Sequence, residues 1–196
     1  MITKTAETSN HILEPIRERW SPRAFADRPV DPDVLRRLFE AARWAMSSFN
    51  EQPWRFIVGV KGQPGYDGVF ACLNDWNQKW AGTAPVIVLV AGRTRFSLDE
   101  SENRVWLYDC GAAAGFLCLQ ATQEGLHTHQ MAGILPEKAH DSLDVPEGFE
   151  VVTAIAIGHQ GEVDRIPDDY HDDERAPRDR KPLDEIVFHG RWGKTS

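Results

Sequence analysis

The sequence has few cysteines, no hydrophobic run long enough to cross a membrane and no excess of positive charge. Cys72, Cys110 and Cys118 include no CxxC pair and lie in apolar surroundings. This argues against a disulfide framework or a zinc site and favours a reducing, cytoplasmic compartment. The strongest apolar run, APVIVLVAG, is far shorter than the roughly 20 residues that span a bilayer. The N-terminal stretch lacks the apolar segment of a signal peptide, so we expect no membrane partner.

The charge balance and the missing motifs exclude further classes. The chain carries 22 Lys and Arg residues against 30 Asp and Glu residues, a net charge of -8. Nucleic acid is therefore not an expected partner, because binding to a phosphate backbone needs a basic face. There is no GxGxxG, P-loop or GxSxG motif, which disfavours a Rossmann dehydrogenase, a P-loop nucleotidase and an α/β-hydrolase.

The apolar pattern predicts helices and strands around one sheet, in two or three layers of a single domain, 1–196. A strong helix is predicted at 30–46, with Asp31 as N-cap and Pro32 as the first helical residue. Other helices are predicted at 11–20, 65–80, 102–124 and 136–143. Strands are predicted at 54–60, 84–92 and 149–158, and HTHQMAG (127–133) is predicted to be a turn.

Two segments have an unusual composition. The centre of the helix at 102–124, CGAAAG, has small side chains that allow close packing, so we expect it in the core or at a subunit interface. After residue 161 the chain is rich in charge and proline, yet it still contains LDEIVF and Trp192. We predict an extended arm, about 162–196, which packs on a surface such as that of another subunit and contains an edge strand at LDEIVF.

Arginines form two clusters in this acidic chain. In RERWSPRAF, Arg19, Ser21 and Arg23 occupy alternate positions of an extended segment, so their side chains can converge on one face. Arg178 and Arg180 have the same spacing in RDRKP. Guanidinium groups and a hydroxyl match a phosphate monoester, which carries about two negative charges. We interpret the clusters as one anion site; the alternative is two solvated basic loops.

Polar side chains also gather at turns. The turn SSFNEQP contains Ser47, Ser48, Asn50 and Gln52, and Asn77 lies near a helix end. These groups could bind the polyol or heterocycle of a cofactor, or they could only satisfy the backbone of a turn.

Two further patterns only weakly indicate a metal site. The histidines of HTH, His127 and His129, have the spacing of two ligands on one strand face, but no acidic or cysteine partner lies close in sequence. The acidic stretch DDYHDDE lacks the glycine and the ligand order of a calcium loop. We therefore predict no metal site.

Six blocks occur in order from about residue 12 to about residue 188: RERWSPRAF, SSFNEQPWRFIV, LNDWNQKWAGTAPVIVLV, YDCGAAAGFLCLQATQEGLHTHQMAGI, LDVPEGFEVVTAIAIGH and RDRKPLDEIV. Together they resemble the FMN-dependent nitroreductase family. The resemblance implies an α+β, three-layer sandwich with a mixed, mainly antiparallel sheet flanked by helices. It also implies a homodimer with two interfacial FMN sites, in which the C-terminal arm reaches the partner subunit.

The resemblance also assigns residues to the cofactor. The segment that grips the FMN phosphate and ribityl chain corresponds to Arg19, Trp20, Ser21 and Arg23, completed by Arg178 and Arg180. The turn lent by the other subunit corresponds to Ser47, Ser48, Asn50 and Gln52. Asn77 corresponds to the asparagine that binds the flavin edge or the ribityl group. The turn whose N–H groups approach flavin N5 and O4 corresponds to Met131, Ala132 and Gly133. No catalytic side chain is assigned, because the hydride step needs none.

The implied function is hydride transfer from NADH or NADPH, via flavin N5, to an electron-poor acceptor such as a nitroaromatic or a quinone, by a ping-pong mechanism. Two alternatives stay open. One is a specialised flavoenzyme of the same fold, either a reductive dehalogenase or a flavin-fragmenting enzyme. The other is a non-catalytic flavin-binding protein.

Overall fold

The computed structural model of the chain describes residues 2–195. Four strands form a sheet in the order β1-β2-β4-β3, and all three strand pairs are antiparallel. The strands are β1 (Trp54–Val60), β2 (Val86–Arg93), β3 (His127–Met131) and β4 (Phe149–Gly158). The α+β class and the antiparallel character of the sheet are confirmed. The parallel pair that a mixed sheet requires does not occur among the described strands.

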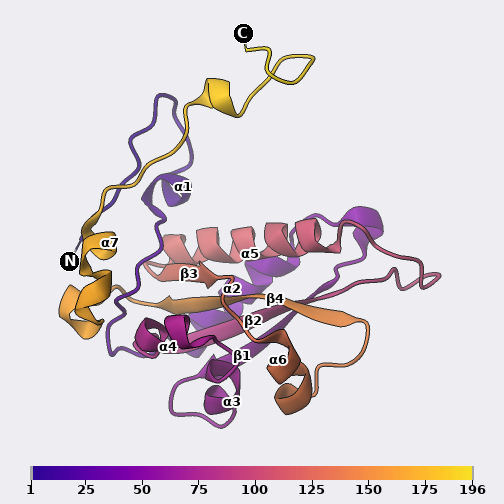
Figure 1. Cartoon of the computed structure of the whole chain (residues 1–196), viewed down its shortest axis with the longest axis horizontal. Coiled ribbons are helices and arrows are strands. Elements are labelled where there is room, and N and C mark those ends of the chain that lie inside the picture. Colours follow the sequence, from indigo (N-terminus) through magenta and orange to yellow (C-terminus); the bar gives the residue numbers. More distant parts are fainter. Residues whose placement is uncertain (1, 196) are drawn as a thin grey trace.

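Helices cover both faces of the sheet, which gives three layers (Figure 1). One face carries α2 (Pro32–Arg43) and α5 (Trp106–Gln123), and the other carries α3 (Tyr66–Phe70), α4 (Asp75–Ala81) and α6 (Pro136–Leu143). Strand β2 is buried on both faces, as predicted. Successive side chains of a strand point to opposite faces, so Val88 joins the core under α2 and α5 while Leu89 joins the core on the other side.

Helix α2 begins as the sequence predicts. The Asp31 side chain accepts a hydrogen bond from the Asp33 N–H at 2.7 Å, and Pro32 is the first helical residue. Because Leu38 and Ala42 lie one turn apart on the same face, both are buried against α5 and the sheet. This packing leaves the polar face of α2 exposed to solvent.

Three predicted elements differ from the structure. Residues 127–131 form β3 rather than a turn, because His127 and His129 pair with β4. The helix predicted at 65–80 is divided into α3 and α4, because Leu73 between them forms a bridge with Ile134. The helix predicted at 11–20 is limited to α1 (Glu14–Glu18), since the backbone is already extended at Arg19.

Helix α5 carries an uncovered face. Its inner side packs on the sheet and α2, whereas Leu107 and Tyr108 are 51% and 76% exposed. On the same outer side, a Cβ atom added at Gly111 or Gly115 would have no neighbouring atom within 4 Å. The small-residue centre of the helix is thus split between the core and an open apolar surface.

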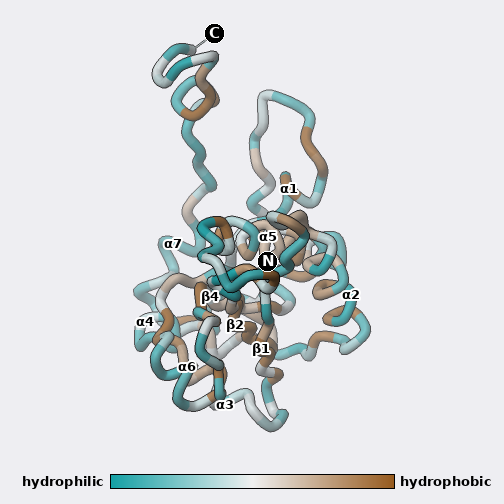
Figure 2. Tube along the Cα trace, turned by 90° about the vertical axis from the view of Figure 1, so that its right-hand side faces the viewer, coloured by the Kyte–Doolittle hydropathy of each residue, from teal (hydrophilic) through white to brown (hydrophobic). Residues whose placement is uncertain are grey.

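The C-terminal arm extends away from the sheet, beyond α7 (His171–Arg175) and the 3-10 turns η2 (Val163–Arg165) and η3 (Asp168–Tyr170) (Figures 1 and 2). The edge strand predicted at LDEIVF is wrong. The segment instead forms a 3-10 turn, η4 (Leu183–Glu185), after Pro182, and it pairs with none of the strands that the structure describes in residues 2–195. Ile186 and Trp192 remain 58% and 90% exposed. No helix among residues 2–195 is both long and apolar enough to cross a membrane.

Candidate functional site

Three arginines from the two sequence clusters lie together in the structure. Burial lowers the pKa of Arg178, and the nearby charges of Arg19 and Arg180 lower it further. None of the three forms an ion pair with a carboxylate among residues 2–195. The Arg19 guanidinium donates a hydrogen bond to the Ser21 hydroxyl at 3.1 Å, which orients both groups. Unpaired cations this close together repel each other, so the arrangement favours binding of an anion.

Arg178 and Arg23 have additional structural contacts. Arg178 donates hydrogen bonds to the backbone carbonyls of Lys4 and Arg17, at 2.9 and 2.7 Å, and so ties the arm to α1. Arg23 already has an anionic partner, because its guanidinium lies 3.4 Å from the Asp173 carboxylate. The cluster therefore contains free cations and one cation that is partly neutralised.

Trp20, which follows Arg19 in the chain, is buried. It is only 5% exposed, its ring meets the His127 ring edge-on at 5.8 Å, and the Lys4 ammonium lies 4.7 Å from its ring centroid. Lys4 is a cation that sequence reasoning missed, because nothing in the N-terminal sequence indicates that it folds back onto residues 19–23.

Gly133 occupies a tight cradle beside Asn77. Its carbonyl accepts hydrogen bonds from the Asn77 side chain at 2.9 Å and from the Asn74 N–H at 3.0 Å. A Cβ atom added at Gly133 would lie only 2.5 Å from Asn74 Nδ2 and 2.7 Å from Asn77 Nδ2, so only glycine fits. Met131 is buried, while Ala132 is exposed next to the cradle. The structure thus brings Asn77 together with Gly133.

The neighbouring histidine is part of the core. His129 Nδ1 hydrogen-bonds the Pro22 carbonyl at 3.0 Å, and its ring packs on Trp80 at 4.5 Å. Burial lowers the pKa of His129 to about 4, so the imidazole is neutral at pH 7. Among residues 2–195, no group of three His, Cys, Asp or Glu side chains is arranged to hold a metal ion.

The polar turn at 47–52 has a strained backbone. Phe49, Asn50 and Gln52 all adopt positive φ values, between 50° and 56°, which non-glycine residues rarely do. The Ser47 hydroxyl accepts a hydrogen bond from the Gln52 N–H at 3.0 Å and so serves the turn itself.

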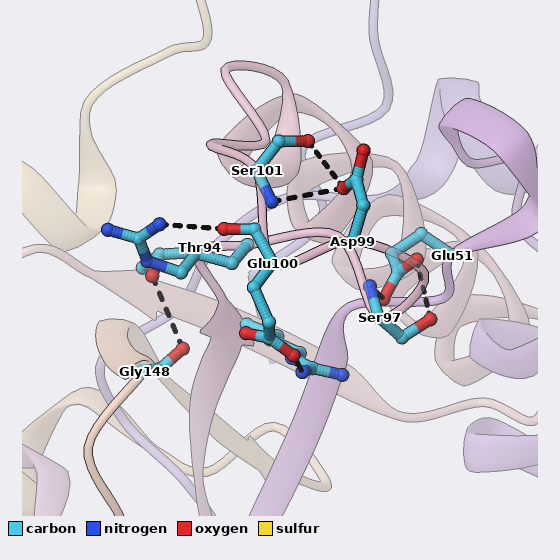
Figure 3. A network of polar contacts seen from close by, with 9 residues as sticks. Glu51, Thr94, Ser97, Asp99, Glu100, Ser101 and Gly148 are labelled. Carbon is cyan, nitrogen blue, oxygen red and sulfur yellow. Dashed lines mark hydrogen bonds and ion pairs between the residues drawn. The ribbon is translucent and has the colours of Figure 1, made fainter.

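Two acidic residues that sequence reasoning missed anchor this turn. Asp109, only 3% exposed in the first turn of α5, accepts a hydrogen bond from the Ser48 N–H at 3.0 Å. The Glu51 carboxylate accepts bonds from both the N–H and the hydroxyl of Ser97, each at 3.0 Å, and so holds the loop after β2 against the turn (Figure 3). Beside this contact, Phe49, Phe96 and Leu98 line a cavity of about 530 Å³.

Within one chain, the predicted site residues form two separate groups. The turn at 47–52 is bonded to the first turn of α5, whereas Trp20 contacts His127, which lies just beyond the last turn of α5. The helix has 18 residues, a length of about 27 Å at 1.5 Å per residue. One chain therefore does not bring the turn to the arginines.

Known proteins resemble this chain in sequence and fold. A sequence profile of the Nitroreductase family matches residues 16–63 and 60–159. An uncharacterized 15.4 kDa protein of Mycolicibacterium smegmatis is 32% identical over 146 residues, which cover 71% of this chain and 97% of that protein. A protein of Archaeoglobus fulgidus named "Putative NADH dehydrogenase/NAD(P)H nitroreductase" is 27% identical over 173 residues, covering 86% of this chain and 94% of that protein. A crystal structure described as an oxidoreductase containing FMN aligns with a TM-score of 0.91 at 33% identity and covers 100% of both chains.

The comparisons identify the class of protein to which this three-layer fold belongs. The family match spans most of the chain, and the chain therefore belongs to the nitroreductase family. The resemblance expected from the sequence is confirmed, and we class the protein with the oxidoreductases of this family.

Proposed function

We propose that the chain is an FMN-dependent oxidoreductase, acting as one domain over residues 1–196. It would use NADH or NADPH to reduce an electron-poor acceptor in a ping-pong cycle. The observation that carries this proposal is the group of arginines without carboxylate partners, Arg19, Arg178 and Arg180. When bound, FMN supplies the hydride chemistry, and the chain supplies binding, orientation and electrostatics.

The residues present fit the two ends of FMN. Arg19, Arg178 and Arg180 would hold the phosphate, since unpaired guanidinium groups form strong charge-assisted hydrogen bonds with phosphate oxygens. At the other end, Asn77 holds the Gly133 carbonyl, which fixes the turn that would face the flavin edge. The Cβ position of Gly133 faces Asn74 and Asn77, so the absence of a side chain lets both amides pack against this turn.

We further propose that the site is completed by a second copy of the chain. The turn at 47–52 and the arginines lie at opposite ends of α5, and the outer face of α5 is apolar and open at Gly111 and Gly115. Two copies packed antiparallel through this face would bring the turn of one copy to the arginines of the other. Two-fold symmetry would create two identical sites. The exposed arm would cover apolar surface of the partner.

The cavity beside the turn suggests the class of acceptor. Its lining combines apolar side chains with polar ones, and the Phe49 and Phe96 rings meet edge-on at 5.8 Å. The lining residues are Phe49, Asn50, Glu51, Phe96, Ser97, Leu98, Asp99 and Ser101. Aromatic walls favour flat, apolar molecules, in agreement with a quinone or a nitroaromatic. For the compartment we propose the cytoplasm, because Cys72, Cys110 and Cys118 are free and buried.

The test is a visible absorption spectrum of the purified protein, followed by anaerobic addition of NADH and then of NADPH, and finally of a quinone. We expect a flavin band that bleaches with at least one nicotinamide and returns with the quinone. A flavin band that persists through both nicotinamides would contradict the proposed reductase activity. A protein that takes up no FMN on reconstitution would contradict the cofactor assignment.

A further inference from the structure

Residues 2–13 form a strap, the N-terminal strap, that folds back onto the cationic cluster. It precedes the range that the family profile matches, which begins at residue 16. The Ala6 N–H donates to the Arg17 carbonyl at 2.8 Å, and Arg178 donates to the Lys4 carbonyl at 2.9 Å. Figure 1 shows the start of the described chain, from residue 2, beside α7. The strap is therefore fixed to both cationic segments.

The Lys4 ammonium has unused hydrogen-bonding capacity. Its Nζ atom makes one hydrogen bond among residues 2–195, to the Asp173 carbonyl at 3.4 Å. An ammonium has three N–H donors, so two of them have no acceptor in the described chain. Burial lowers the pKa of Lys4; Glu174 opposes this shift and Arg23 adds to it. An additional anion beside Lys4 would stabilise its charged form.

A cavity lies next to this ammonium. It has a volume of about 370 Å³, and its lining residues include Lys4, Arg178 and Arg180. Glu7 and Asp179 also line it, but both are exposed to solvent. Residues of the strap and of the arm that carry cations thus line one cavity, which is large enough for a phosphate group.

We propose that Lys4 is a further phosphate ligand and that the N-terminal strap closes the cofactor site by placing this ammonium opposite Arg178. The inference rests on the proposed function, because the anion in question is the phosphate of FMN. Its chemical consequence is selectivity. A charge added at the phosphate end strengthens binding of FMN but contributes nothing to binding of riboflavin, which has the same ring and no phosphate.

The experiment is a fluorescence-quenching titration of the apoprotein with FMN and, separately, with riboflavin. Lys4→Met removes the charge and keeps an unbranched stem on the Trp20 ring, while Lys4→Arg keeps the charge. Lys61→Met is the matched control, because Lys61 also donates to a backbone carbonyl, that of Gly82 at 2.7 Å, and lies outside the cluster.

We expect Lys4→Met to raise the Kd of FMN about tenfold, the size of one charge-assisted hydrogen bond, and to leave the Kd of riboflavin unchanged. Lys4→Arg and Lys61→Met should bind both flavins like the wild type. Added salt should weaken FMN binding less in Lys4→Met than in the wild type, because one screened charge is gone.

Equal weakening of FMN and riboflavin in Lys4→Met would overturn the inference, since it would mean that the strap acts only by packing. Unchanged FMN binding would overturn it as well. Both results leave the cofactor assignment intact, because the wild type still binds FMN. A wild-type protein that binds no FMN would instead contradict the proposed function, and the inference with it.

Discussion

Replacement of Gly133 by alanine tests the cradle directly. The new Cβ atom would lie 2.5 Å from Asn74 Nδ2 and 2.7 Å from Asn77 Nδ2, so both amides must move. Asn74 caps α4 through its bond with the Asn77 N–H at 3.0 Å, and Asn77 holds the Gly133 carbonyl at 2.9 Å. A lost cap and a lost hydrogen bond cost about 1 kcal/mol each, and the remaining overlap adds about 1 kcal/mol. We expect the free energy of unfolding to fall by about 3 kcal/mol.

Urea denaturation followed by circular dichroism measures this change, and flavin content reports on the site. The matched control is Gly82→Ala at the other end of α4, where φ is −62° and an added Cβ would have an ordinary contact with Phe70 at 3.5 Å. The control should change the free energy of unfolding by less than about 0.5 kcal/mol. A Gly133→Ala protein as stable as Gly82→Ala, with full flavin content, would refute the cradle.

Three further predictions concern the turn, the open helix face and the buried histidine. Asp109→Leu removes the buried acceptor of the Ser48 N–H, so urea denaturation should show that the free energy of unfolding falls by about 1–3 kcal/mol. Asp109→Asn keeps an oxygen acceptor and should lower the free energy of unfolding less. A Cβ atom added at Gly115 meets no atom within 4 Å among residues 2–195, so the folded monomer of Gly115→Leu should persist. Sedimentation should nevertheless show a dimer that dissociates; an unchanged dimer would place the interface elsewhere. His129 has a pKa lowered to about 4 by burial, so its neutral form stabilises the fold above its unfolded pKa of about 6.5, and this contribution is lost as the pH falls toward 4. The stability difference between wild type and His129→Gln should therefore shrink between about pH 7 and pH 5, and a constant difference would contradict the assignment.

The sequence predicts the parts of the fold that local signals determine. Asp31 and Pro32 define the start of α2 because capping and proline geometry act within one turn. The apolar run of β2 predicts a strand buried on both faces, and the structure has one. The alternate spacing of the arginines suggests one anion site but equally fits two solvated loops, so the proximity of Arg19 to Arg178 becomes evident only in the structure.

Other features depend on contacts between distant segments and leave little local signal. The composition of residues 127–131 suggests a turn. They form a strand in the structure because they pair with the edge of β4. Asp109 looks like an ordinary helix residue until its bond with Ser48 is seen. The role of Lys4 depends on a strap that folds back to the arm, more than 160 residues away in the sequence.

The central claim is that the arginines of one chain and the turn of another form one FMN site, and a mixed dimer tests it most directly. One chain carries Arg19→Ala with Arg180→Ala, and the other carries Asp109→Leu with Asn50→Ala; the two carry different tags and are coexpressed. Each variant alone should retain little FMN, whereas the mixed dimer should hold about half the flavin of the wild type, because one of its two sites is intact. A mixed dimer as empty of flavin as its parents would contradict the shared site.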